Sequence, residues 1–212
     1  MSEVMEQLRD GTADLHQSAE QQDFQQRMFR ATLRREEYAA WLGQMWLVHR
    51  DLEAALRRVA PGDARFAAVL PDHDKEPRLA ADLAALGGPL PEPLPATARI
   101  LARIAAVERA EPLRLLGFQY VLEGSANGNR ILARRLLPAL GLDAGQAGRY
   151  LDPYGERQRE VWAKFKQDMQ AVGFPPAECA VLVEAAREMF AAIADLSGDL
   201  SRLPAPAPRL AS

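Results

Sequence analysis

The chain has 212 residues, of which 48% are hydrophobic and 26% are charged, and its formal net charge is -3 at pH 7. This length suits one large domain or two small ones, with a core that needs neither disulfides nor structural zinc. The single cysteine, Cys179, excludes an intramolecular disulfide, and a slightly acidic chain without a Lys/Arg block argues against nucleic acid as a partner. The polar N-terminus and the lack of a run of about 18 apolar residues favour a cytoplasmic protein without a membrane span.

Apolar residues recur every three or four positions through most of the chain, which is typical of amphipathic helices. The segments with this spacing cover residues 5–19, 38–52, 100–107, 113–140, 161–172 and 177–200. The segment 113–140 is almost continuously apolar, so we expect it at the centre of the fold. Because no segment alternates β-branched residues, we predict one all-α domain of six to eight helices over residues 1–203. The Pro/Ala-rich residues 204–212 are expected to form a disordered tail.

His16 lies at the edge of the apolar stripe of the first predicted helix, about 40° from Thr12. Arg9 precedes it by seven residues and Glu20 follows it by four, so all three side chains project from one side. A carboxylate one turn away commonly orients a metal-ligating imidazole, because one ring nitrogen binds the metal while the other donates to the carboxylate. An ordinary ion pair at the core boundary has the same spacing and is the commoner case.

Two glycines, Gly124 and Gly128, interrupt the segment that otherwise has the strongest helical pattern. Each glycine costs about 1 kcal/mol relative to alanine in a helix interior. A buried helix weakened twice therefore indicates a kink, or a backbone that approaches something flat or bulky. A short loop between two ordinary helices would explain the same glycines equally well.

The two segments together resemble heme oxygenases. The family's motif T-x-x-x-H-x-x-x-E stands here as Thr12, His16 and Glu20, and Y-V-x-E-G-S-x-x-G occupies residues 120–128. Shorter matches in register extend the likeness to about residue 200, namely Asp23-Phe24, Ala81-Asp82-Leu83, Glu111-Pro112 and Lys164-Phe165-Lys166. Each motif is weak alone, but their order and spacing together are specific.

The resemblance implies a single-domain helical bundle that holds heme between a proximal N-terminal helix and a kinked, Gly-rich distal helix. It implies a heme-degrading monooxygenase for which heme is both substrate and cofactor. Such an enzyme uses O2 and electrons from a reductase or a ferredoxin-type donor, and it opens heme to biliverdin, carbon monoxide and ferrous iron. A protein that accepts the bilin product is a further partner that the resemblance allows.

The resemblance also assigns roles to individual residues. It makes His16 the iron ligand, with Glu20 accepting the other ring N–H. The residues that it assigns to heme binding are Arg9, His16, Glu20, Tyr120, Lys166 and Gln170. Those that it assigns to catalysis on the distal side are His49, Gly124, Ser125, Gly128 and Asn129. An ordinary buried histidine remains the alternative for His49.

Some positions depart from the family pattern. Asn127 and Asn129 stand where an apolar and a small residue are usual, and Gln170 replaces an arginine. These departures leave open a heme-binding carrier or sensor of the same fold without turnover. A carboxylate-bridged di-iron oxidase is a third alternative, but it needs Glu-x-x-His pairs, and no histidine here has glutamate three residues before it.

The remaining polar features receive simpler interpretations. His73 is predicted to be a solvated loop residue, and the tryptophans are predicted to be core packing. Six arginines outnumber the acids near them in the sequence, which indicates a solvated basic face or a docking face for an acidic electron donor. They are Arg99, Arg103, Arg109, Arg114, Arg134 and Arg135.

Overall fold

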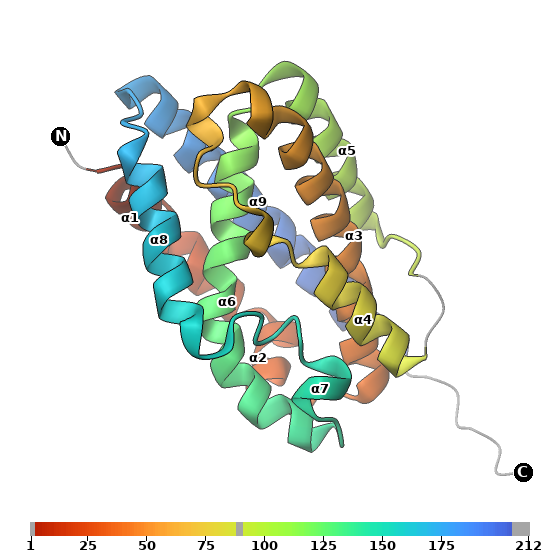
Figure 1. Cartoon of the computed structure of the whole chain (residues 1–212). Helices are drawn as coiled ribbons and strands as arrows, with labels where there is room; N and C mark the ends of the chain where they lie inside the picture. The colour runs from red at the N-terminus through yellow and green to blue at the C-terminus, as the bar shows by residue number, and fades with distance from the viewer. Residues whose placement is uncertain (1–2, 88–90, 205–212) are drawn as a thin grey trace, which may run out of the picture.

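The protein is described by a computed structural model in which residues 3–87 and 91–204 are placed. Within these ranges the chain forms nine α-helices and no strand, which confirms the all-α class (Figure 1). The helices are α1 (Val4–Glu20), α2 (Asp23–Phe29), α3 (Arg35–Val59), α4 (Glu76–Leu86), α5 (Pro95–Ala110), α6 (Arg114–Ala139), α7 (Ala144–Ala147), α8 (Gln158–Ala171) and α9 (Pro176–Ser201). The predicted tail beyond Pro204 lies outside the described residues. No helix within them is both long and apolar enough to cross a membrane.

The helix number exceeds the predicted six to eight because α2 and α7 have only seven and four residues. Such short helices contain too few apolar positions to show a period. The prolines and glycines mark several boundaries, as expected from their backbone preferences. Pro95 and Pro176 occupy the first turns of α5 and α9, and α4 ends at Gly87, whose φ is +71°.

Helix α6 lies at the centre of the bundle, as its apolar sequence predicts (Figure 1). Leu115, Leu116 and Phe118 are at most 1% exposed. Helix α9 crosses α6 at Gly117, where an added Cβ would lie 2.6 Å from the Leu182 carbonyl oxygen and 2.6 Å from the Ala185 Cβ. The two backbones can therefore approach this closely only because residue 117 has no side chain.

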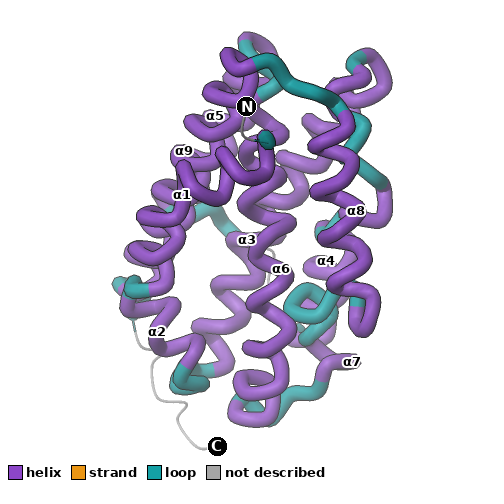
Figure 2. Tube along the Cα trace, turned by 90° about the vertical axis from the view of Figure 1, so that its left-hand side faces the viewer, coloured by secondary structure: helices purple, strands orange, loops and turns teal. Residues whose placement is uncertain are grey.

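Helix α1 packs along α9 on one side of the bundle, so that it faces α6 (Figure 2). Its buried residues Val4, Leu8 and Thr12 follow one another at four-residue spacing. The Arg187 guanidinium on α9 fixes the rotation of α1, because Nη1 donates to the Gly11 carbonyl at 2.6 Å and to Asp14 Oδ1 at 2.7 Å. One further step of four residues brings His16 to the side of α1 that faces the interior.

A buried ion pair joins α6 to the segment before α4. The Lys75 Nζ donates to Glu123 Oε2 at 2.6 Å, to the Tyr154 hydroxyl at 2.6 Å and to the His73 carbonyl at 2.8 Å. Lys75 and Glu123 are each 1% exposed. Burial lowers the pKa of Lys75, against the opposing effect of the Glu123 carboxylate.

The prediction for His73 is wrong. Its side chain is 3% exposed, and its ring makes edge contacts with Phe165 and Tyr154. Burial lowers the pKa of this imidazole. The residues around it are polar in sequence, but helix α8 and the segment before it cover the turn.

Candidate functional site

A cavity of about 710 Å³ is lined by α1 and α9, by α6 opposite them, and by α3 and α8. This volume lies within the usual range for small-molecule sites, about 300–1,000 Å³. Most of the wall is apolar or aromatic, with a few polar groups. The predicted site residues that line it are Arg9, His16, Glu20, Tyr120, Gly124, Ser125, Gly128 and Asn129. The fold therefore brings residues of both motifs into the wall of one cavity.

His16 forms one wall of this cavity. Its ring packs edge-on against Phe190 of α9, with the ring centroids 5.7 Å apart. Its Nδ1 lies 3.7 Å from Glu20 Oε1, which is within ion-pair range but longer than a hydrogen bond. The His16 side chain is 61% exposed, and none of the placed residues hydrogen-bonds to Nε2. This nitrogen is therefore free to bind a ligand in the cavity.

The wall formed by α6 contains both glycines. The helix runs without a break from Arg114 to Ala139, so the alternative of a loop at the glycines is wrong, while the kink stays a prediction. An added Cβ at Gly128 would meet nothing within 4 Å, and one at Gly124 would lie 3.5 Å from the ring of Trp162. The bare backbone of α6 thus faces open space at Gly128 and the ring of Trp162 at Gly124.

The polar residues beside the glycines make short local hydrogen bonds. Ser125 Oγ donates to the Leu122 carbonyl at 2.7 Å, and Asn127 Nδ2 donates to the Gly124 carbonyl at 3.0 Å. Gln158 of α8 donates to Asn127 Oδ1 at 3.1 Å, which ties α6 to α8. Asn129 lines the cavity and is partly exposed. The departures from the family pattern therefore lie in the wall itself.

A second cavity, of about 640 Å³, adjoins the first and shares Arg9, Tyr120 and Trp162 with it. Lys166 and Gln170, the other two residues predicted to bind heme, line this second cavity. The Gln170 Oε1 is buried without a hydrogen-bond partner. Arg9 is 69% exposed and pairs with Asp10 at 2.7 Å, whereas Lys166 is exposed and unpaired among the described residues.

His49 does not line either cavity. It is 2% exposed and lies behind Tyr150, whose hydroxyl is 3.2 Å from His49 Nε2. Tyr150 and Trp162 line the main cavity, and sequence reasoning missed both in that role. Trp162 was predicted as core packing, and Tyr150 follows a short helix without a recognisable motif.

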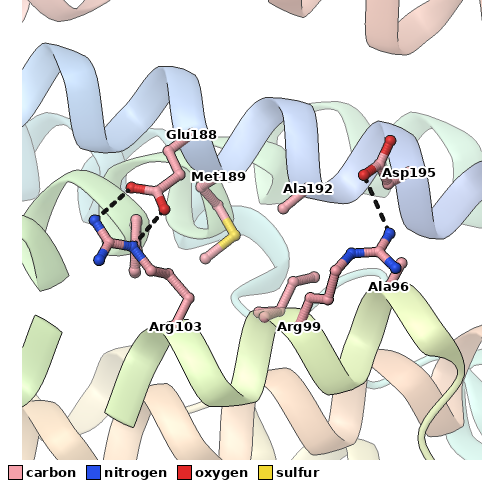
Figure 3. Close-up of a pocket in the computed structure, with 9 residues that line it drawn as sticks. Ala96, Arg99, Arg103, Glu188, Met189, Ala192 and Asp195 are labelled. Atoms are coloured by element: carbon pink, nitrogen blue, oxygen red, sulfur yellow. Dashed lines mark hydrogen bonds and ion pairs between the residues drawn. The ribbon is translucent and has the colours of Figure 1, made fainter. Parts of the chain in front are cut away.

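Three of the six arginines that were predicted to form a basic face have acidic partners. Arg103 of α5 donates to Glu188 of α9 at 2.5 Å, and Arg99 pairs with Asp195 at 3.2 Å, across a small apolar cavity (Figure 3). Arg114 also pairs with Glu188, at 2.9 Å. The neutralising acids come from α9, between 74 and 96 residues away in the chain. The sequence neighbourhood alone could not reveal them.

Changing Gly128 to alanine is expected to affect stability and function in opposite directions. The new methyl group meets open space, and alanine is favoured over glycine in a helix by about 1 kcal/mol, so the free energy of unfolding should rise. The same methyl group narrows the cavity, so any reaction that needs a ligand against α6 should slow, roughly 10-fold or more. Urea unfolding measures the change in the free energy of unfolding, and the turnover rate measures the effect on the reaction.

Gly198 supplies a matched control for this substitution. It lies in α9 away from the cavity, and an added Cβ would meet only the flexible end of Arg202, at 3.5 Å or more. Gly198→Ala should stabilise the helix without slowing the reaction. Equal turnover in the Gly128→Ala and Gly198→Ala variants would show that residue 128 does not face the ligand.

The whole arrangement is similar to solved structures of heme oxygenases. The first is heme oxygenase-2 from Synechocystis in complex with heme and NO, with a TM-score of 0.88 and 22% identity, over 94% of this chain and 85% of that chain. The heme oxygenase from Leptospira interrogans gives a TM-score of 0.87 and 22% identity, over 95% of this chain and 100% of that chain. At this level of identity the similarity shows the fold.

Sequence similarity identifies the family. Heme oxygenase 2 from Synechocystis is 26% identical over 151 residues, which are 69% of this chain and 60% of that protein, less than two thirds of its length. The family model described as heme oxygenase matches residues 2–198, nearly the whole chain. Together with the fold and the position of both motifs, this match shows that the chain belongs to the heme oxygenase family.

Proposed function

We propose that the protein is a heme-degrading monooxygenase that opens heme to biliverdin, carbon monoxide and ferrous iron. In this proposal it is cytoplasmic and uses O2 and electrons from a reductase or a ferredoxin-type donor. The observation that carries the proposal is the position of His16, whose Nε2 is free on one wall of the cavity while Gly124 and Gly128 form another. Membership of the family supports the same conclusion.

The residues of the cavity fit a heme. A neutral imidazole is a common iron ligand, and the mainly apolar wall suits a flat macrocycle. The cations of Arg9 and Lys166, at the neighbouring cavity, suit its propionate groups. When bound, heme supplies an iron that activates oxygen and a ring that is itself the substrate.

Each group of side chains then has a distinct task. His16 would hold the iron, and Glu20 would accept the second ring N–H, which fixes the orientation of the imidazole. The glycines of α6 would allow the backbone to lie close to a bound flat ligand, which would narrow the space on that side of the cavity. Ser125 and Asn129 would supply hydrogen-bonding groups for proton transfer on that side.

Titration of the ligand-free protein with hemin tests the proposal in two steps. A shifted Soret band shows binding, and bilin absorbance after addition of a reductant system shows turnover. A protein that binds hemin without forming bilin would be the carrier or sensor instead, an alternative favoured by Asn127 and Asn129 in the cavity wall. The absence of a Soret shift would overturn both. The di-iron alternative needs a cluster of ligands, and the described residues contain no group of three or more His, Cys, Asp or Glu suited to a metal ion.

Removing the two cations is expected to weaken heme binding modestly. Arg9→Ala and Lys166→Ala should each raise the dissociation constant up to about fivefold, because exposed ion pairs contribute little in water. The larger effect should be on the seating of the ring, read as a changed mixture of bilin isomers. Lys164→Ala is the matched control, since Lys164 is on the same helix but pairs with Asp168 at 2.8 Å. An isomer mixture that changes no more than in this control would exclude the two cations from the site.

A further inference from the structure

Tyr150 separates the main cavity from the buried polar core. Its ring lines the cavity beside Trp41, with the ring centroids 5.5 Å apart, and the residue is only 2% exposed. Its backbone N–H donates to Asp82 Oδ2 at 2.9 Å, which anchors the segment to α4. The Tyr150 hydroxyl is thus held in place between the cavity and His49.

Glu53 determines which nitrogen of His49 bears the proton. The Glu53 carboxylate accepts the backbone N–H of Lys75 at 2.7 Å and that of Glu76 at 3.2 Å. Burial would raise the pKa of Glu53, but the hydrogen bonds that its carboxylate accepts from His49 and from these two backbone N–H groups lower it, so the group is an ionised acceptor. His49 Nδ1 lies 2.9 Å from Glu53 Oε1, and a carboxylate can only accept there, so Nδ1 bears the hydrogen.

The tautomer of His49 in turn fixes the direction of the Tyr150 hydroxyl. With a single proton, on Nδ1, His49 has an acceptor at Nε2. The Tyr150 hydroxyl, 3.2 Å away, therefore donates to Nε2. Burial raises the pKa of Tyr150, so the hydroxyl keeps the proton that it donates. The lone pairs of the Tyr150 oxygen are then left as acceptors on the side of Ser125 of α6, with which Tyr150 also makes a side-chain hydrogen bond, and both residues line the cavity.

We propose that Glu53, His49 and Tyr150 form a fixed hydrogen-bonded chain that presents the Tyr150 oxygen to the cavity as an acceptor. A water molecule that donates one proton to this oxygen directs its second proton towards the bound ligand. Tyr150 is then the polar group that acts at the cavity wall, and His49 and Glu53 are positioning residues that act through it. The three hydrogen-bonded residues would thus hold a proton-donating water on the side of the cavity formed by α6. This role rests on the proposed oxidation of heme.

The tautomer can be read without heme. Long-range proton–nitrogen correlation spectra of the ligand-free protein, labelled with ¹⁵N-histidine, distinguish a proton on Nδ1 from one on Nε2. The chain has three histidines, so His49→Leu assigns the signal by its loss. We expect His49 to carry its proton on Nδ1. A proton on Nε2 would reverse the direction of the hydroxyl and overturn the proposal, whatever the protein does with heme.

The second measurement tests whether the hydrogen bonds of Glu53, His49 and Tyr150 act on the bound ligand. In the ferrous carbon monoxide complex, the C–O stretching frequency falls when a donor points at the ligand. Tyr150→Phe removes the acceptor that holds the water, so the frequency should rise. His49→Leu leaves the Tyr150 hydroxyl without its acceptor and free to turn towards the cavity, so the frequency should fall. Opposite shifts are therefore expected from two variants of one chain.

Tyr38→Phe is the matched control, because the Tyr38 hydroxyl is also buried but donates to the Ala147 carbonyl at 2.7 Å and does not line the cavity. Shifts in the Tyr150 and His49 variants no larger than in this control would overturn the proposal. Turnover should fall about 10²-fold in Tyr150→Phe, the lower range for a lost proton-transfer group, and remain near normal in Tyr38→Phe. Failure to bind heme at all would refute the proposed function, while the tautomer would still decide the direction of the chain.

Discussion

Replacing His16 with alanine is expected to abolish the normal ferric heme spectrum and bilin formation while leaving the helical fold intact. The side chain is 61% exposed and makes one edge contact with Phe190, so its loss removes little packing. It would, however, remove the nitrogen that faces the cavity. Hemin titration followed by absorbance measures the first effect, and far-ultraviolet circular dichroism measures the second. Added imidazole should partly restore both the spectrum and the activity, since it can occupy the space that the side chain leaves.

Glu20→Ala is a control for this experiment in which we expect a smaller effect than in His16→Ala. Glu20 lies 3.7 Å from the His16 ring and would act only on its orientation and basicity. We therefore expect a heme complex with a slightly altered spectrum and slower turnover, not a loss of binding. A wild-type heme spectrum in His16→Ala would assign the iron to another residue and remove the main support for the proposed function.

Lys75→Met is expected to destabilise the protein by about 3–5 kcal/mol, the usual cost of leaving one member of a buried ion pair without its partner. The substitution removes the hydrogen bonds that Nζ gives to Glu123 and Tyr154. Glu123 Oε1 already lacks a partner, so the buried carboxylate would lose its cation and keep only a neutral neighbour, the Tyr154 hydroxyl. Because Glu123 precedes Gly124 on α6, the variant should also bind heme less tightly. Urea unfolding and hemin titration test both effects.

The double variant Lys75→Met with Glu123→Met separates charge from packing. Replacing both members of a buried pair by apolar residues of similar size is often neutral or stabilising, so the double variant should recover most of the lost free energy of unfolding. Lys164→Met, which breaks an exposed pair with Asp168, should cost less than about 1 kcal/mol. Strict additivity of the two core substitutions would contradict the assignment of a coupled pair.

The sequence predicted the parts of the fold that depend on local periodicity. The apolar spacing identified the helices that became α1, α3, α5, α6, α8 and α9, and the residues of both motifs came together in one cavity. His73 was misplaced because its neighbours are polar, whereas its burial depends on Tyr154 and Phe165, more than 80 residues away. The acids that pair with Arg99, Arg103 and Arg114 were missed for the same reason.

His49 shows what a match at a single position leaves undetermined. The resemblance aligned it with a residue of the distal pocket, but its ring lies behind Tyr150 and is held by Glu53. Sequence spacing would have detected Glu53, four residues on, as a neighbour of His49 on the same helix. Tyr150, 101 positions away, carries no such signal, so the group that reaches the cavity could be found only in three dimensions.

The crossing of α6 and α9 at Gly117 sets the width of the cavity, although Gly117 itself does not line the cavity. At this point the Gly117 backbone lies against backbone and side-chain atoms of α9, and eleven residues further along α6 the bare Gly128 faces open space. A single methyl group at residue 117 would push the two helices apart at this contact. Because both helices are long and stiff, it would tilt α6 away from α9 by one small angle over their whole length. The displacement grows with distance from the crossing, so it would be larger at Gly128 than at Gly124. Residue 117 is thus a position from which evolution or design could tune how large a ligand the protein accepts without altering any residue that touches it.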